Sequence, residues 1–342
     1  MKEMLILKVI PDLDERTKNI YPTIAEAIQA AHDIHAKETS LKADPGYTPV
    51  TIMITEGIYH ERLEIHTPCI TLCGTGKSPA DTVITHGDYA QAIHADGEKY
   101  GTFRTPTLFI DANEVAIKNL TVENSAGSGA SIGQALAVYA DGDMLTFEKC
   151  RLLGHQDTLF TAPLPPAPYQ KNGFRGPKES APRTDGRHYY KNCYICGTVD
   201  FIFGSAAAYF EGCELFSVHR DKGGYVTAAS TPEGARFGYI FNRCRFTSDC
   251  PADSVYLGRP WRDYARVVIL NSYLGEHIKK SGWHDWNKPQ AHDTVYYAEY
   301  NNYGPGAATD SRAGFARILT ADEAETYDIC GDSVFEALAG KF

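Results

Sequence analysis

The sequence predicts an all-β protein whose short strands form a coiled stack. Two observations support this fold class. Short apolar strand patterns recur in one alignment register between residues 115 and 274, and one clear helix, which begins near residue 23, is found in the first 300 residues. Strands that recur without helices between them indicate a solenoid, because one coil cannot bury its apolar face alone and each needs its neighbours.

The composition fits a soluble globular chain and excludes two functional classes. The 342 residues are 43% hydrophobic and 22% charged, with a formal net charge of −10. A nucleic-acid-binding protein would usually carry a basic face, so we expect no nucleic-acid partner. No apolar run reaches the roughly 18 residues of a membrane span, so we expect no membrane segment. One domain over residues 1–342 accounts for this length, because all-β folds often exceed the usual domain size.

The N-terminal part supplies the first strands and the helix. Met1 to Val9 is apolar but lacks a small-residue cleavage site, so we interpret it as a first strand and not as a signal peptide. Thr23 and Glu26 have capping-box spacing and predict a helix start. Pro49 to Ile65 predicts strands, and Ile70 to Leu72 predicts another.

Six segments then align on one column of inward-facing residues. Each carries apolar side chains at three fixed places, and the column residues are separated by 30, 43, 20, 31 and 28 positions. Equivalent side chains of stacked coils should form ladders. The column residues are Leu120, Cys150, Cys193, Cys213, Cys244 and Ser272.

Four of the nine cysteines stand in this column, in which they act as small apolar residues. The step of 20 residues makes Cys193 and Cys213 neighbours on adjacent coils, where a disulfide is geometrically permitted and the redox compartment decides whether it forms. Cys193 and Cys196 have C-x-x-C spacing. A redox or zinc role would need further partners, and no second close pair follows.

The step of 43 residues contains a loop insertion at 162–187, which is rich in proline and charge. A loop of this length is usually functional or disordered. Near the C-terminus, Tyr296 to Tyr300 is a candidate last strand. Thr320 to Tyr327 predicts a short helix with Thr320 as N-cap.

A carboxylate pair follows from the register of the repeat. Asp157 lies seven residues after Cys150, and Asp200 lies seven residues after Cys193. If these coils are neighbours, the two aspartates lie one above the other. Two carboxyl groups this close push each other's pKa values apart, so one can be the ionised nucleophile and the other the acid. The alternative is two strand-end aspartates in separate solvated turns.

Four more residues fit chemistry at such a pair. Gln134 and Gln156 carry amides that could donate to an oxyanion. Arg259 could keep an aspartate ionised, and Trp261 offers a flat face for a sugar. Each alone could equally be a surface amide, a solvated arginine or a core tryptophan.

At these residues the chain resembles the pectin methylesterases (pectinesterases) of carbohydrate esterase family 8. The resemblance implies a right-handed parallel β-helix, a single-stranded pectin-lyase-like solenoid with a short N-terminal capping helix and a short C-terminal helix, and a cleft along one face. The motifs occur in family order over most of the chain. They are Gln134–Ala137, Gly154–Leu159, Gly197–Gly204 and Leu257–Trp261, supported by Glu123–Gly127 and Gly282–Trp286.

Residue by residue, the resemblance implies that Asp200 is the nucleophile and Asp157 the general acid/base. Gln134 and Gln156 match the anion-hole donors, and Arg259 matches the residue bonded to the nucleophile. Trp261 matches a substrate-contact aromatic, and Phe160 and Phe203 are assigned to substrate binding with it.

The implied reaction hydrolyses C6 methyl esters of galacturonate, with water as second substrate and with no metal or cofactor. We expect methyl-esterified homogalacturonan or its oligomers as substrate, and a monomer. Because the insertion at 162–187 departs from the family pattern, we hypothesise that it narrows one end of the cleft and favours short oligomers over polymer.

Two other functions stay open at this point. A pectate lyase or polygalacturonase shares the fold, and a lyase would want an acidic Ca²⁺ cluster; a non-catalytic carbohydrate-binding β-helix is the other alternative. The absence of a recognisable signal peptide and the odd cysteine count favour the cytoplasm, whereas a polymer substrate favours export with the signal removed.

Overall fold

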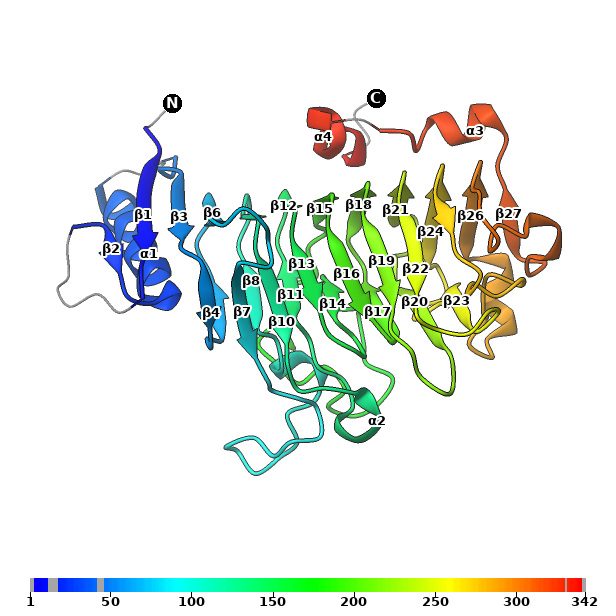
Figure 1. The fold of residues 1–342 in the computed structure, drawn as a ribbon, viewed down its shortest axis with the longest axis horizontal. Coiled ribbons are helices and arrows are strands. Elements are labelled where there is room, and N and C mark those ends of the chain that lie inside the picture. The colour runs from blue at the N-terminus through cyan, green and yellow to red at the C-terminus, as the bar shows by residue number, and fades with distance from the viewer. Residues whose placement is uncertain (1–2, 12–17, 42–45, 330, 340–342) are drawn as a thin grey trace.

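Three parallel β-sheets wind around one hydrophobic core in the computed structural model, which describes residues 3–11, 18–41, 46–329 and 331–339. The sheets have 12, 8 and 7 strands and are named sheets A, B and C here. Successive coils place one strand in each sheet in turn, and every strand pairing within the sheets is parallel (Figure 1). The predicted all-β stack is therefore confirmed in the described residues.

The strands of sheet A, in spatial order, are β2 (Ile20–Tyr21), β1 (Leu5–Val9), β3 (Val50–Ile54), β6 (Ile70–Gly74), β9 (Ala116–Lys118), β12 (Leu145–Glu148), β15 (Arg187–Lys191), β18 (Ala207–Glu211), β21 (Tyr239–Asn242), β24 (Arg266–Leu270), β26 (Tyr296–Tyr300) and β27 (Ala316–Ile318). Sheet B contains β4 (Gly57–Tyr59), β7 (Thr82–His86), β10 (Thr121–Asn124), β13 (Arg151–Leu153), β16 (Tyr194–Gly197), β19 (Glu214–Ser217), β22 (Arg245–Ser248) and β25 (Tyr273–Leu274). Sheet C contains β5 (Leu63–Ile65), β8 (Leu108–Asp111), β11 (Val138–Asp141), β14 (Leu159–Thr161), β17 (Val199–Gly204), β20 (Gly224–Ala229) and β23 (Val255–Gly258).

Helices lie outside the coils. The α-helices are α1 (Ile24–Leu41), α2 (Gly129–Ile132), α3 (Ala321–Glu325) and α4 (Val334–Leu338). Short 3₁₀ turns are η1 (Thr102–Arg104), η2 (Pro289–Asp293), η3 (Thr309–Ser311) and η4 (Gly331–Ser333). No helix in the described ranges is both long enough and apolar enough to cross a membrane.

The predicted column lies in the core in the predicted register. All six column residues are at most 2% exposed. Just before the column, Phe147 pairs in register with Tyr190, which in turn pairs with Phe210, and their rings stack at centroid distances of 4.9 and 4.5 Å. Side chains at equivalent positions of successive coils thus stack and continue the core from coil to coil, as the repeat predicts.

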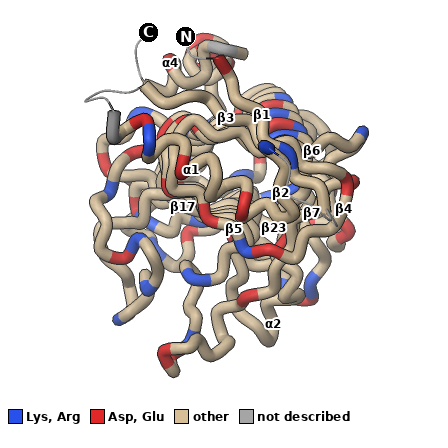
Figure 2. The backbone as a smooth tube through the Cα atoms, turned by 90° about the vertical axis from the view of Figure 1, so that its left-hand side faces the viewer, with Lys and Arg blue, Asp and Glu red and all other residues tan. Residues whose placement is uncertain are grey.

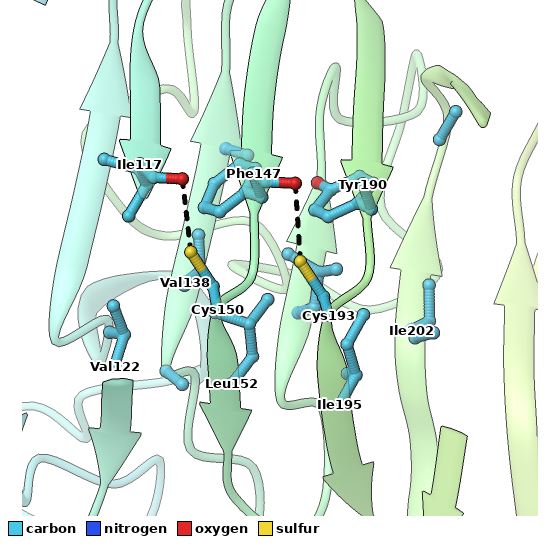
Figure 3. Close-up of a cluster of buried hydrophobic side chains, with 14 of the residues drawn as sticks. Ile117, Val122, Val138, Phe147, Cys150, Leu152, Tyr190, Cys193, Ile195 and Ile202 are labelled. Carbon is cyan, nitrogen blue, oxygen red and sulfur yellow. Dashed lines mark hydrogen bonds between the residues drawn. The ribbon is translucent and has the colours of Figure 1, made fainter. Parts of the chain in front are cut away.

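The cysteines of the column use their thiols within the stack. Cys150 Sγ donates to Ile117 O at 3.1 Å, and Cys193 Sγ donates to Phe147 O at 3.4 Å (Figure 3). Cys193 and Cys213 are neighbours, as predicted, since Cys193 N donates to Cys213 Sγ at 3.4 Å. Both thiols are free in this structure.

A left-handed residue turns the chain between sheets A and B immediately before each column position. Asn119, Lys149, Asn192, Arg243 and Asn271 all have φ between 49° and 55°, and Gly212 has φ 61°. Asparagine and glycine tolerate this conformation best. The corner repeats in register, and Asn271 Nδ2 donates to Asn242 Oδ1 nearby at 3.1 Å.

Helices α1 and α3 lie at opposite ends of the solenoid (Figure 1). Helix α1 packs Ile24, Ala27 and Ala31 into the main core at the N-terminal end, which Figure 2 views directly. The predicted start is confirmed in part, since Glu26 N donates to Thr23 Oγ1 at 3.2 Å, but α1 spans 18 residues and is not short. At the other end, α3 begins with the predicted capping box of Thr320 and Glu323.

Three details of the elements differ from the sequence prediction. Strand β26 is not the last, because β27 pairs with it. A second short C-terminal helix, α4, lies above β15 and β18 in Figure 1. Helix α2 was not predicted, because four residues, three of them small, carry no periodic signal.

Candidate active site

Asp157 lies two residues before β14, and Asp200 is the second residue of the neighbouring strand of sheet C, β17. Gln156 and Val199 form a parallel bridge, and Asp157 N donates to Val199 O at 3.0 Å. Two residues later, Leu159 pairs with Ile202, so Asp157 and Asp200 are opposite each other in register. The carboxylate pair predicted from the seven-residue offset is therefore in place.

Both aspartates have left-handed backbone conformations, with φ 63° at Asp157 and 50° at Asp200. Aspartate is among the few non-glycine residues that adopt this region. Asp157 lies in the corner between β13 of sheet B and β14 of sheet C, and at Asp200 the register of β17 against β20 shifts between Val199 and Ile202. Unusual backbone at such a pair is typical of functional sites.

Arg259 holds the Asp200 carboxylate in a two-pronged contact. Its Nε donates to Asp200 Oδ1 at 2.9 Å and its Nη2 donates to Oδ2 at 2.7 Å. The guanidinium carbon lies 3.9 Å from the ring centre of Tyr225 and 3.7 Å from that of Trp286. A planar guanidinium fixed between two aromatic faces orients both carboxylate oxygens.

The surroundings of the pair push both carboxyl pKa values upward. Burial raises the pKa of Asp157 well above its usual range, and the charge of Asp200 raises it further. Burial also raises the pKa of Asp200, but the Arg259 hydrogen bonds and charge oppose this rise. Asp200 is therefore the carboxyl that stays ionised more readily, and Asp157 is the one that holds a proton.

The two glutamines lie on adjacent coils beside the pair. Ala135 N donates to Gln156 O at 3.2 Å, which places Gln134 next to Gln156 across the coils. Neither side-chain amide has a hydrogen-bond partner among the described residues, and both residues are partly exposed. A Cβ on Gly129 would lie 2.9 Å from Gln156 Cβ, so Gly129 leaves the room that this side chain needs.

The predicted substrate aromatics have different surroundings. Trp261 is partly exposed and packs on an aromatic cluster that contains Phe160 and Phe203. Its ring centre lies 5.6 Å from Phe203 and 6.3 Å from Phe160. Phe160 is 0% and Phe203 4% exposed, so in this structure they support Trp261 from below and Trp261 alone of the three presents a substantial surface.

Sequence reasoning missed three residues around Asp200. Tyr225 and Trp286 enclose Arg259, and the Arg220 charge lowers the pKa of Asp200. The motif Gly282–Trp286 was recognised, but its spacing does not say which tryptophan faces the site. Trp283 is buried and stacks on Tyr297 at 4.3 Å, whereas Trp286 reaches Arg259.

The insertion at 162–187 folds back along the outer face of sheet C. Phe174 joins the aromatic cluster beside Phe103 and Trp261. Lys178 Nζ lies 2.5 Å from Asp111 Oδ1 and 3.4 Å from Asp141 Oδ2. The loop is thus attached to β8 and β11 through Lys178, and to the aromatic cluster that contains Trp261 through Phe174.

Comparison with known proteins decides the family. The pectinesterase family model matches residues 14–164 and 173–331. The chain belongs to the pectinesterase family. Pectinesterase 31 of Arabidopsis thaliana is 32% identical over 278 residues, which cover 80% of this chain and 79% of that relative. This membership makes the chain an ester hydrolase that acts on carboxylic esters.

Solved pectinesterase structures share the whole fold. Pectin methylesterase from carrot superposes with a TM-score of 0.75 at 27% identity, covering 98% of this chain and 93% of that one. A pectin methylesterase in complex with a hexasaccharide superposes with a TM-score of 0.72 at 29% identity, covering 97% and 96%. The right-handed parallel β-helix expected from the resemblance is confirmed by these pectinesterase structures.

The described part of the chain contains no group of three or more His, Cys, Asp or Glu side chains arranged to hold a metal ion.

Proposed function

We propose that this pectinesterase hydrolyses galacturonate C6 methyl esters through a covalent intermediate on Asp200. The pectin-ester substrate follows from the family, and the solved relative that binds a hexasaccharide supports an oligosaccharide or polymer substrate. The observation that carries the covalent step is the two-pronged Arg259–Asp200 contact in register with the proton-holding Asp157.

In the first half-reaction, Asp200 attacks the ester carbonyl carbon of the substrate. The Gln134 and Gln156 amides donate to the oxyanion that forms. As the tetrahedral intermediate collapses, the C6–OCH₃ bond breaks and Asp157 gives its proton to the departing methoxide, so methanol leaves. An anhydride between the galacturonate and Asp200 remains, and Asp157 is now ionised.

In the second half-reaction, Asp157 takes a proton from water, whose oxygen attacks the galacturonate carbonyl of the anhydride. The same amides stabilise this second oxyanion. The bond to Asp200 breaks, and the products are a galacturonate carboxyl and the regenerated Asp200 carboxylate. Asp157 is again protonated, so the cycle balances with one water consumed and one methanol released.

A methanol-release assay on methylated pectin and on short methylated oligogalacturonides tests the proposal. Asp200→Ala should abolish turnover, and acid-quenched wild-type enzyme should carry a galacturonate adduct on the peptide containing Asp200. Methanol release without any adduct, at substrate saturation in rapid quench, would contradict the covalent step. New reducing ends or unsaturated products would instead favour the hydrolase or lyase alternative.

The anion-hole assignment makes a separate prediction. Gln134→Ala should lower kcat by roughly 10²–10³ and change KM much less, because the amide acts mainly on the transition state. Gln156→Ala should behave in the same way. An unchanged kcat in the Gln134 variant would remove that residue from the anion hole. Gln91→Ala, a nearby amide whose Oε1 accepts from Lys99 Nζ at 2.6 Å, is the matched control.

We further propose that the chain acts as a monomer in a compartment that keeps thiols reduced. The eight described cysteines are free, and the column thiols donate to backbone carbonyls. Thiol titration of the denatured protein, purified with and without an alkylating agent, tests this. Sedimentation equilibrium tests the oligomeric state.

A further inference from the structure

The insertion contains a segment that the family pattern does not include. The family model matches the chain up to residue 164 and again from residue 173, and skips residues 165–172. This skipped segment carries Tyr169, whose side chain is large, apolar in its ring and 64% exposed. A large exposed aromatic side chain thus lies on a short segment that is otherwise rich in proline.

Tyr169 is held in place from two other elements. Its hydroxyl donates to Trp261 O at 3.0 Å and receives a hydrogen bond from Lys288 Nζ at 2.9 Å. The Arg262 guanidinium carbon lies 3.8 Å from the ring centre, so the guanidinium covers one face of the ring. Arg262 in turn donates to Ala167 O at 2.7 Å. Arg262 therefore covers one face of the Tyr169 ring, and the solvent-exposed area of the side chain lies on the rest of the ring.

A continuous set of contacts joins this ring to the reacting carboxylates. Trp286 contacts Arg259, which binds Asp200, and Lys288 Nζ lies 5.6 Å from the Trp286 ring centre and 5.0 Å from that of Tyr169. Arg262 lies between the rings of Tyr169 and Trp261, at 3.8 and 5.0 Å. The Tyr169 ring is thus beside the partly exposed Trp261 and is linked through Lys288 and Trp286 to the Arg259 side of the site.

We propose that Tyr169 is a specificity-determining residue, an extra sugar-binding platform that stacks on a pyranose ring of the substrate beyond the sugar that contacts Trp261. This inference rests on the proposed function. Tyrosine supplies a rigid, amphipathic contact surface at low entropic cost, and its immobilisation by Lys288 and Arg262 means that little further ordering is needed on binding. The platform favours substrates long enough to reach from Asp200 to Tyr169.

This proposal opposes the hypothesis drawn from the sequence alone, in which the loop narrows the cleft and favours short oligomers. The two make opposite predictions for long substrates. Removal of the Tyr169 ring should weaken the use of long chains if the ring is a platform, and should improve it if the loop is an obstruction.

The test measures kcat and KM for methanol release over methylated oligogalacturonides of increasing length. Tyr169→Ala should raise KM about three- to tenfold for the long oligomers. It should leave kcat, and the KM for the shortest oligomers, unchanged. This range corresponds to the usual binding free energy of one aromatic contact. Tyr169→Phe keeps the ring and should restore the long-chain KM. Tyr303→Ala, which removes a 57% exposed tyrosine elsewhere on the solenoid, is the matched control.

A merely structural role would lower the melting temperature and change KM equally at all lengths, and this outcome overturns the proposal. Unchanged or lower KM for long chains overturns it as well. If Tyr169→Ala does not fold, Tyr169→Leu replaces it, because leucine still covers Arg262 but has no aromatic face. The KM values of the Leu variant over oligomer length are then compared with wild type. Failure of the proposed function would appear differently, as a wild-type protein that releases no methanol from any substrate.

Discussion

At the scale of single residues, the two aspartates show how their surroundings give opposite roles to two side chains of the same type. Both are buried on neighbouring strands, so desolvation raises the pKa of each. Only Asp200 has a guanidinium bonded to both oxygens. Asp157 has the Asp200 charge beside it and no such partner, which makes it the proton carrier of the pair.

Asp157 should lower the stability of the fold at neutral pH. Its folded-state pKa is raised, so folding takes up a proton between the unfolded pKa, about 3.9, and the folded pKa. The stabilising effect of the protonated carboxyl is complete below the unfolded pKa and is lost as pH rises through the folded pKa. Asp157→Asn should therefore stabilise the protein at pH 7 by about 0.5–2 kcal/mol while stopping turnover.

Chemical denaturation of wild type and Asp157→Asn across pH measures this. The stability difference should be near zero below the unfolded pKa and grow with pH until it reaches a plateau. A constant difference at all pH values would mean that Asp157 does not titrate with a raised pKa.

The reciprocal variant, Asp200→Ala, leaves the Arg259 guanidinium without its ion-pair partner. Because the Arg259 side chain is only 15% exposed, the variant should lose several kcal/mol of folding stability.

At the scale of elements, the insertion is tied to the sheet by charge as well as by aromatics. Asp111 and Asp141 pair in register on β8 and β11, and burial raises the pKa of Asp141. Lys178 from the insertion lies within reach of both carboxylates. Its charge relieves the repulsion between them, and they in turn hold the loop against sheet C.

Lys178→Ala should therefore loosen the insertion. We expect limited proteolysis to cleave the chain within residues 162–187 severalfold faster than in wild type, because opening of this loop no longer breaks an ion pair. Lys171→Ala, on the exposed surface of the same loop, is the control. Equal cleavage rates in wild type and the Lys178 variant would show that the other contacts of the loop, those of Phe174 and Tyr169 among them, hold it without this ion pair.

The elements also show what sequence reasoning could reach. The column and the aspartate register were predictable because a solenoid repeats one pattern of burial, and Cys150 and Cys193 mark equivalent places in two coils. The partners of Arg259 were not, since Tyr225 and Trp286 come from separate coils and their orientation depends on turn geometry. The left-handed corners at Lys149 and Arg243 were missed because these two residues carry no turn signature.

At the scale of the whole molecule, the C-terminal segment covers the outer face of sheet A. Helices α3 and α4 return over the strands in Figure 1 and form a second hydrophobic cluster with Tyr209, Ile240 and Val268. Tyr209 Oη donates to Ile329 O at 2.6 Å, and Arg187 Nη1 donates to Phe335 O at 2.9 Å. The catalytic candidates lie on sheet C, so stability and chemistry are placed on different faces of one solenoid.

Removal of residues 320–342 should consequently lower stability far more than activity. The truncation uncovers the apolar outer face of β18, β21 and β24, and a contiguous patch of that kind promotes association. We expect a lower melting temperature and binding of a hydrophobic dye, with kcat per folded molecule close to wild type. Arg243→Ala, which removes a half-exposed ion pair to Asp328, should change the free energy of unfolding by less than about 0.5 kcal/mol. A truncated protein that keeps its melting temperature would show that the coils of sheet A need no cover. A loss of kcat at full folding would show instead that the C-terminal segment acts on the site through the coils.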